Sequence, residues 1–241
     1  MVDGKDIFRR DFDLRIMKES TRAIVQKVVF FVVLYLLYQN LLYIFIAPGV
    51  YSEPAYVIYL IIAYTAALFD TLVRKVSEEE PEKKIYAILI LLLFLAEPWF
   101  LIAAYYENTL LIAPSVPFWN SNGVMYVGFF LYVSACFLEV TARTEIGRFG
   151  TGDLVIEEDH QLYTEGIYKY IRHPIYTGGL IGIVGFGLVF RSIITLVGAA
   201  IVYFLILNMR AKEEERQLEE VFGDEYIEYK RTSKKFFPFI Y

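Results

Sequence analysis

The sequence has very few of the side chains that bind metals or form disulfide bonds. Its 241 residues include one cysteine, Cys136, and two histidines, His160 and His173. A single cysteine has no partner within the chain, and two histidines are too few for a multi-histidine metal centre. We therefore expect no internal disulfide bond and no metal site, and we interpret Cys136, which lies in an apolar run, as a packing residue.

Charged residues are also scarce and show no basic surplus. They make up 21% of the chain, and the net charge is −5. The sequence has no basic stripe with interleaved aromatic residues, so we expect no nucleic-acid partner. It also lacks a short basic N-terminal region followed by a cleavable apolar core, so we do not expect a removed signal peptide.

Apolar residues, in contrast, make up 57% of the chain and occur in long runs. A helix needs about 20 apolar residues to cross the hydrocarbon core of a bilayer. The sequence therefore predicts an all-α polytopic membrane bundle of about six spans, which ends in a hairpin of two short spans. The runs without Lys or Arg cover about residues 28–73 (interrupted at 47–54), 85–106, 124–142, 175–190 and 192–209.

The positive residues predict how this bundle is oriented. Of the 23 Lys and Arg residues, all except Arg191 fall in residues 1–27, 74–84, 143–172 and 210–241, which are alternate connections. Cytoplasmic loops carry an excess of Lys and Arg. We therefore expect a multi-pass protein with both termini in the cytoplasm, in the cell membrane or, in a eukaryote, the endoplasmic reticulum.

The same pattern divides the chain into three parts. Residues 1–22 mix charges with Phe8, Phe12 and Ile16, which predicts a cytoplasmic amphipathic lead on the membrane surface. Residues 23–142 should hold four N-terminal spans, and residues 143–241 a helical hairpin with a cytoplasmic tail. The connection 143–171 is long and rich in glycine and acids, and connections of this length are usually functional.

A first polar cluster precedes the hairpin. It consists of Tyr170, Arg172, His173 and Pro174, with Tyr176 and Gly178 following in the apolar run. Proline suits the first turn of a helix and disfavours helical backbone at the residue before it. His173 should therefore lie outside the helix, at the mouth of the hairpin. Gly178 would allow close approach of a backbone or a flat ligand.

A second polar cluster begins where the last apolar run ends. A helix that continues out of the membrane would place Arg210, Glu214 and Leu218 on one face, because they are spaced by four residues. Glu215 follows directly, and Gly223 should end the helix. The two clusters should therefore meet across the hairpin.

Each cluster also has a simpler interpretation. Arg172 and His173 could bind a lipid phosphate and cap a helix, and the acids at 213–215 could form a solvated helix face. The two clusters together favour a ligand site at the membrane surface. Among acids inside the spans, Glu97 could serve either structural pairing or the lining of an acceptor cavity.

The two clusters form one compound pattern. This pattern resembles that of the isoprenylcysteine carboxyl methyltransferases, and the broader membrane phospholipid methyltransferases share it. The resemblance covers about residues 143–241, whereas residues 1–142 match only as membrane spans. The pattern reads Tyr168-x-Tyr170-x-Arg172-His173-Pro174-x-Tyr176-x-Gly178, then Arg210-x-x-x-Glu214-Glu215-x-x-Leu218-x-x-x-Phe222-Gly223-x-x-Tyr226-x-x-Tyr229, and finally Pro238-Phe239-Ile240-Tyr241.

The resemblance implies S-adenosylmethionine as methyl donor and a lipophilic acceptor that enters from the bilayer. The acceptor could be a prenylcysteine carboxylate, a phospholipid amine, or another isoprenoid or quinone-like lipid. Residues 143–241 would then be the donor-binding catalytic region, with Arg172, His173 and Glu214 in catalytic positions. The residues that the resemblance assigns to the cofactor are Tyr170, Arg172, His173, Pro174, Tyr176, Gly178, Arg210, Glu214 and Glu215.

Two other functions remain open at this point. Membrane sterol reductases, which use NADPH, have a similar Arg-His-x-x-Tyr-x-Gly hairpin, but they have more spans, and the segment Arg210–Glu215 favours the methyltransferases. The chain could also be a non-enzymatic membrane scaffold that keeps the fold. Methyl transfer from a sulfonium needs mainly alignment and exclusion of water, so few catalytic side chains are expected.

Overall fold

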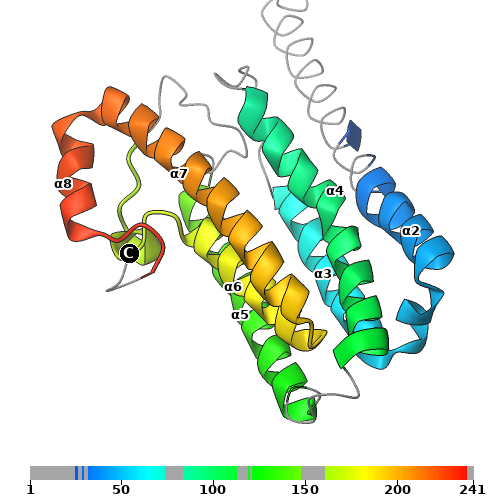
Figure 1. Cartoon of the computed structure of the whole chain (residues 1–241). Helices are drawn as coiled ribbons and strands as arrows, with labels where there is room; N and C mark the ends of the chain where they lie inside the picture. The colour runs from blue at the N-terminus through cyan, green and yellow to red at the C-terminus, as the bar shows by residue number, and fades with distance from the viewer. Residues whose placement is uncertain are drawn as a thin grey trace, which may run out of the picture.

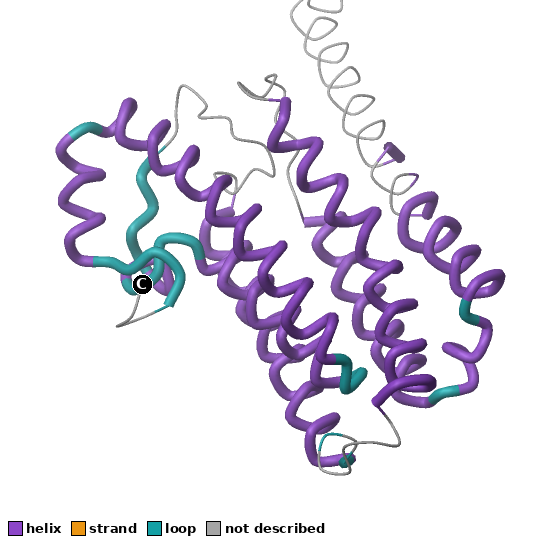
Figure 2. The backbone as a smooth tube through the Cα atoms, viewed as in Figure 1, coloured by secondary structure: helices purple, strands orange, loops and turns teal. Residues whose placement is uncertain are grey.

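The computed structural model describes residues 25, 26, 29, 32–73, 84–112, 119, 121–147 and 161–237. The predicted amphipathic lead, residues 1–22, and the closing segment 238–241 lie outside these ranges, as do residues 148–160 within the connection 143–171. Helices dominate the described residues (Figure 2). The described parts contain no β-strand, only an isolated bridge between Ile171 and Lys234.

The helices form a tilted bundle (Figure 1). In this view α2 lies at one side and α7 crosses in front of α5 and α6, while α8 turns back toward the segment that precedes α6. Short π-helical or 3-10 segments adjoin several of the helices. The main elements are α2 (Gln39–Ile46), α3 (Pro54–Val73), α4 (Lys84–Glu107), α5 (Asn122–Ile146), α6 (Pro174–Val189), α7 (Ala200–Phe222) and α8 (Asp224–Thr232).

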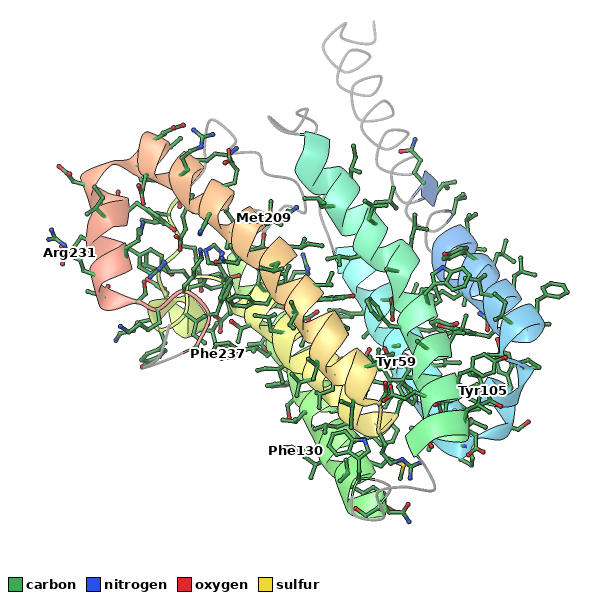
Figure 3. All side chains as sticks on the ribbon, viewed as in Figure 1. Tyr59, Tyr105, Phe130, Met209, Arg231 and Phe237 are labelled. Atoms are coloured by element: carbon green, nitrogen blue, oxygen red, sulfur yellow. The ribbon has the colours of Figure 1, made fainter. Side chains whose placement is uncertain are left out.

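The bundle has the character of a membrane protein. Two described helical stretches, Asn122–Ile146 and Thr195–Phe222, are long and apolar enough to cross a bilayer, and three shorter apolar helices accompany them. Large apolar side chains such as Phe45, Phe130 and Phe137 are exposed on the outside of the bundle, as lipid contact requires (Phe130 is labelled in Figure 3). The predicted all-α membrane bundle is confirmed, whereas the count of six spans stays a prediction.

Glycines bring α5 and α6 unusually close together. A Cβ atom on Gly128 of α5 would lie 2.4 Å from the backbone nitrogen of Val189, and one on Gly185 of α6 would lie 2.7 Å from that of Tyr132. Small residues allow membrane helices to pack in this way. The contact fixes α6 along α5, and with it the position of His173 at the start of α6.

A buried acid joins the far end of this hairpin to α4. The Glu107 carboxylate accepts hydrogen bonds from the backbone N–H groups of Ile193 (3.0 Å) and Ile194 (3.1 Å), and from the Ser192 hydroxyl. A helix start leaves several N–H groups without partners in the helix itself. Glu107 therefore caps the second half of the hairpin from a different helix.

The polar end of the bundle follows the sequence prediction closely. α7 runs without a break from its apolar part into the polar extension Arg210–Phe222, and Gly223, with φ +54°, ends it before α8 begins. One boundary differs, because α5 continues to Ile146 and so takes up the start of the predicted connection 143–171. After α8, residues 233–237 return toward the start of α6, as Figure 1 shows.

Candidate functional site

The structure brings the two predicted polar clusters together at one end of the hairpin. Arg172 and His173 come from the segment before α6, and Tyr176 from its first turn. Arg210, Glu214 and Glu215 come from the polar extension of α7. As predicted, Pro174 occupies the first helical turn and His173 has non-helical backbone angles, φ −124° and ψ 61°.

Glu215 is the centre of the buried charges. Its Oε1 accepts a hydrogen bond from Arg172 Nε at 2.9 Å and lies 3.3 Å from His173 Nε2. Its Oε2 lies 3.8 Å from the Lys235 Nζ. Three basic side chains from two segments therefore surround one carboxylate, which compensates for the loss of water around these buried groups.

Glu214 belongs to a second set of contacts. Its Oε2 accepts a hydrogen bond from the Tyr176 hydroxyl at 2.9 Å, and that hydroxyl in turn accepts one from Arg210 Nε at 2.7 Å. His173 Nδ1 lies 3.6 Å from the same carboxylate oxygen. The rings of His173 and Tyr176 are stacked, with centroids 5.3 Å apart and planes within 2° of parallel. The stack and the hydrogen bonds fix all four side chains in one arrangement.

The two carboxylates determine the charge of the imidazole. Burial by itself lowers the pKa of His173, but the hydrogen bonds and negative charges of Glu214 and Glu215 outweigh burial and raise it above the ordinary value. The two acids therefore favour the cationic form of His173. In that form the imidazole donates hydrogen bonds and orients its partners.

The segment Ser233–Phe237 closes one side of the site. The backbone N–H groups of Arg172 and His173 donate to the carbonyls of Lys234 (2.8 Å) and Lys235 (3.1 Å). Arg172 Nη1 also donates to the Ser233 carbonyl at 2.7 Å. The bridge between Ile171 and Lys234 is this backbone pairing. Arg172 therefore both contacts Glu215 in the site and holds the segment Ser233–Phe237 in place.

Three predicted residues lie differently from the rest. Tyr170 is 60% exposed. Pro174 is buried and begins α6. At Gly178 a Cβ atom would lie 2.4 Å from Glu139 Cγ, so the close approach expected there is to α5. Their roles toward a cofactor stay predictions.

Lys235 is a residue of the site that the sequence pattern did not indicate. It is buried, and its Nζ donates to Asn208 Oδ1 at 3.1 Å besides facing Glu215, whereas the neighbouring Lys234 is exposed. Burial lowers the pKa of Lys235, and the charge of Glu215 partly offsets this. Two adjacent lysines look alike in a sequence, so only the docked position of the segment distinguishes them.

Two polar groups in the cluster are available to a ligand. None of the described residues engages Arg172 Nη2, and none engages Glu214 Oε1. The Glu214 side chain is also 35% exposed, far more than that of Glu215 at 10%. The site therefore offers a guanidinium edge to an anionic group and a carboxylate oxygen to hydroxyl or ammonium groups.

Comparison with known proteins finds a family match over the part of the chain that holds the site. Residues 124–225 match the model of the phospholipid methyltransferase family, and this range contains all nine predicted site residues. Among solved structures, the eukaryotic intramembrane Ras methyltransferase, isoprenylcysteine carboxyl methyltransferase, aligns with a TM-score of 0.58 and 20% identity over 90% of this chain and 77% of that chain. No curated protein matches the chain. The predicted resemblance is confirmed, and the structural likeness shows the fold.

Proposed function

We propose that this chain, whose site region matches the phospholipid methyltransferases, is an integral-membrane methyltransferase that uses S-adenosylmethionine to methylate a lipophilic acceptor. One observation carries the proposal. Arg172, His173 and Glu214, predicted from two separate parts of the sequence, meet in one cluster inside the matched range. Neither NADPH reduction nor a scaffold role gains support from any feature of this cluster.

The free polar groups fit the donor. Arg172 Nη2 would bind the carboxylate at the amino-acid end of the donor, and Glu214 Oε1 would accept hydrogen bonds from its ribose diol. The stacked rings of His173 and Tyr176 would form one wall. Bound there, the donor supplies a methyl group on a sulfonium. The protein contributes alignment and the exclusion of water, to which the docked segment Ser233–Phe237 adds cover.

The acceptor would arrive from the bilayer side of α5–α7. An amine acceptor must be deprotonated before it attacks, and either Glu214 or the neutral form of His173 would take that proton. A carboxylate acceptor needs no base. Glu97 accepts hydrogen bonds from Gln39 Nε2 and the Tyr59 hydroxyl, each at 3.4 Å, and would line the acceptor path from α4.

Isothermal titration tests the donor. Purified protein in detergent should bind S-adenosylhomocysteine, and Glu214→Gln should weaken this binding, while Glu220→Gln, on the exposed face of α7, should not. Binding of NADPH but not S-adenosylhomocysteine would replace this function with reduction, and binding of neither would favour the scaffold. Transfer of labelled methyl groups into a lipid extract would then identify the acceptor.

We also propose that both termini are cytoplasmic, from the distribution of Lys and Arg. Single cysteines can test this in a Cys136→Ala background with a membrane-impermeant reagent. A cysteine at position 150 should be protected in intact cells, whereas cysteines at positions 51 and 117 should react. Labelling of position 150 from outside the cell would contradict the proposed orientation.

A further inference from the structure

Tyr226 of α8 has a buried hydroxyl without a hydrogen-bond partner. The residue is 1% exposed, and no described residue bonds to its oxygen. Buried polar groups are almost always paired, because burial removes their bonds to water and an unpaired group destabilises the fold. The hydroxyl of Tyr226 therefore calls for an explanation.

The surroundings of Tyr226 belong to the donor site. Its phenol is within electrostatic reach of Glu215, Glu214 and Arg172, the charged groups of the cluster. Its ring packs edge-on against Tyr229, with centroids 5.9 Å apart. Figure 1 shows α8 turned back beside the segment before α6. Tyr226 therefore borders the site from an element that carries none of the predicted residues.

The other buried tyrosines here are all paired. The Tyr229 hydroxyl donates to the Tyr168 carbonyl at 2.6 Å, and the Tyr168 hydroxyl to the Ala142 carbonyl at 3.3 Å. Tyr176 bonds both Arg210 and Glu214. A second buried tyrosine hydroxyl without a partner among the described residues, that of Tyr56, packs among aromatic rings of the core. Tyr226 is thus the unpaired hydroxyl beside the charged cluster.

We infer that Tyr226 is a donor-binding residue, whose hydroxyl forms a hydrogen bond with a hydrogen-bond-donating group of the bound methyl donor. The neighbouring Glu214 and Glu215 disfavour an anion there and favour an ammonium or a hydroxyl, from which the phenol oxygen accepts. The donor carries both, as its amino group and its ribose diol. The inference rests on the proposed function and adds a residue just beyond the matched range 124–225.

Replacing Tyr226 should affect ligand binding and protein stability differently. In the ligand-free protein, burial removes water from the Tyr226 hydroxyl and no hydrogen bond replaces it. Tyr226→Phe should therefore leave the melting temperature unchanged or raise it. The same variant should weaken S-adenosylhomocysteine binding about three- to tenfold, the effect of one lost neutral hydrogen bond. Tyr229→Phe is the matched control. It should lower the melting temperature, because it loses the bond to Tyr168, and keep the affinity.

The experiment is titration calorimetry and thermal unfolding of the full chain in detergent, with two ligands. S-adenosylhomocysteine has the amino group and the ribose, and 5′-methylthioadenosine has only the ribose. A loss of affinity for both ligands assigns the ribose as the partner of Tyr226, and a loss for S-adenosylhomocysteine alone assigns the amino group.

Other outcomes would overturn the inference. Equal affinity of the parent and Tyr226→Phe for S-adenosylhomocysteine would refute it while leaving the proposed function intact. A lower melting temperature of ligand-free Tyr226→Phe would show that the hydroxyl has a structural partner, and would refute it as well. A parent protein that binds no S-adenosylhomocysteine would reject the proposed function together with the inference.

Discussion

Arg172→Ala should both weaken donor binding and release the C-terminal segment, because this one side chain joins the two. Its Nε donates to Glu215 at 2.9 Å and its Nη1 to the Ser233 carbonyl at 2.7 Å. A hydrogen bond that involves a charged group contributes about 1.5–3 kcal/mol. The bond to Ser233 alone should therefore hold the segment closed by a factor of about ten to a hundred.

Limited trypsin digestion measures the release of the segment. Trypsin cleaves after Lys234 and Lys235, and when reclosing is fast the cleavage rate follows the population of the open form. Arg172→Ala should raise that rate about ten- to a hundredfold and weaken S-adenosylhomocysteine binding by a similar factor. Lys169→Ala, at an exposed position three residues before Arg172, should change neither the cleavage rate nor the affinity for S-adenosylhomocysteine.

Arg172→Lys refines the prediction. Lysine keeps the positive charge but cannot reach Glu215 and Ser233 with the two edges of a planar fork. The Arg172→Lys variant should bind the donor more tightly than Arg172→Ala does. Its segment Ser233–Phe237 should be as open as in Arg172→Ala. If Arg172→Ala is cleaved at the parental rate, the bonds of Arg172 to the segment do not hold it, and the reasoning from these two distances is wrong.

Three further results are expected from other parts of the molecule. Glu97→Gln should keep donor affinity in calorimetry while turnover with a lipid acceptor falls, since Glu97 contacts α2 and α3; loss of donor affinity would contradict this assignment. Because the acids raise the pKa of His173, its contribution to stability is complete below the ordinary value of 6.5 and is lost as pH rises through the higher folded-state pKa. Melting temperatures measured across this range should fall with pH in the parent and stay flatter in His173→Gln. Gly185→Ala should lower the melting temperature, because its Cβ would lie 2.7 Å from a backbone nitrogen, whereas Gly198→Ala, with no atom within 4 Å, should be neutral or stabilising; equal melting temperatures would show that α5 and α6 adjust to each other.

The features that the sequence predicted correctly follow from local rules. Pro174 determines the backbone of its neighbour, so the non-helical His173 could be read directly. The four-residue spacing from Arg210 to Glu214 gave the shared face of α7, and Gly223 gave its end. The meeting of the two clusters also followed, because a hairpin returns its second half to the level of its first.

The features that could not be predicted depend on long-range docking. No local signal shows that Glu215 is shared by Arg172, His173 and Lys235, because Lys235 reaches it only after α8 has reversed the chain. The sequence predicts at Gly178 close approach of a backbone or a ligand, and only the packing of α5 shows that Glu139 lies there. The unpaired hydroxyl of Tyr226 is likewise visible only from its three-dimensional surroundings.

The cap that Glu107 provides has a consequence for how the protein is assembled in its membrane. Without this carboxylate the backbone N–H groups of Ile193 and Ile194 would lose a charged hydrogen-bond partner, and a bond of this kind contributes about 1.5–3 kcal/mol. α4 precedes the hairpin in the chain, so a nascent hairpin would find its cap already inserted. An α6–α7 hairpin inserted without α4 would instead lack this cap at the start of its second half.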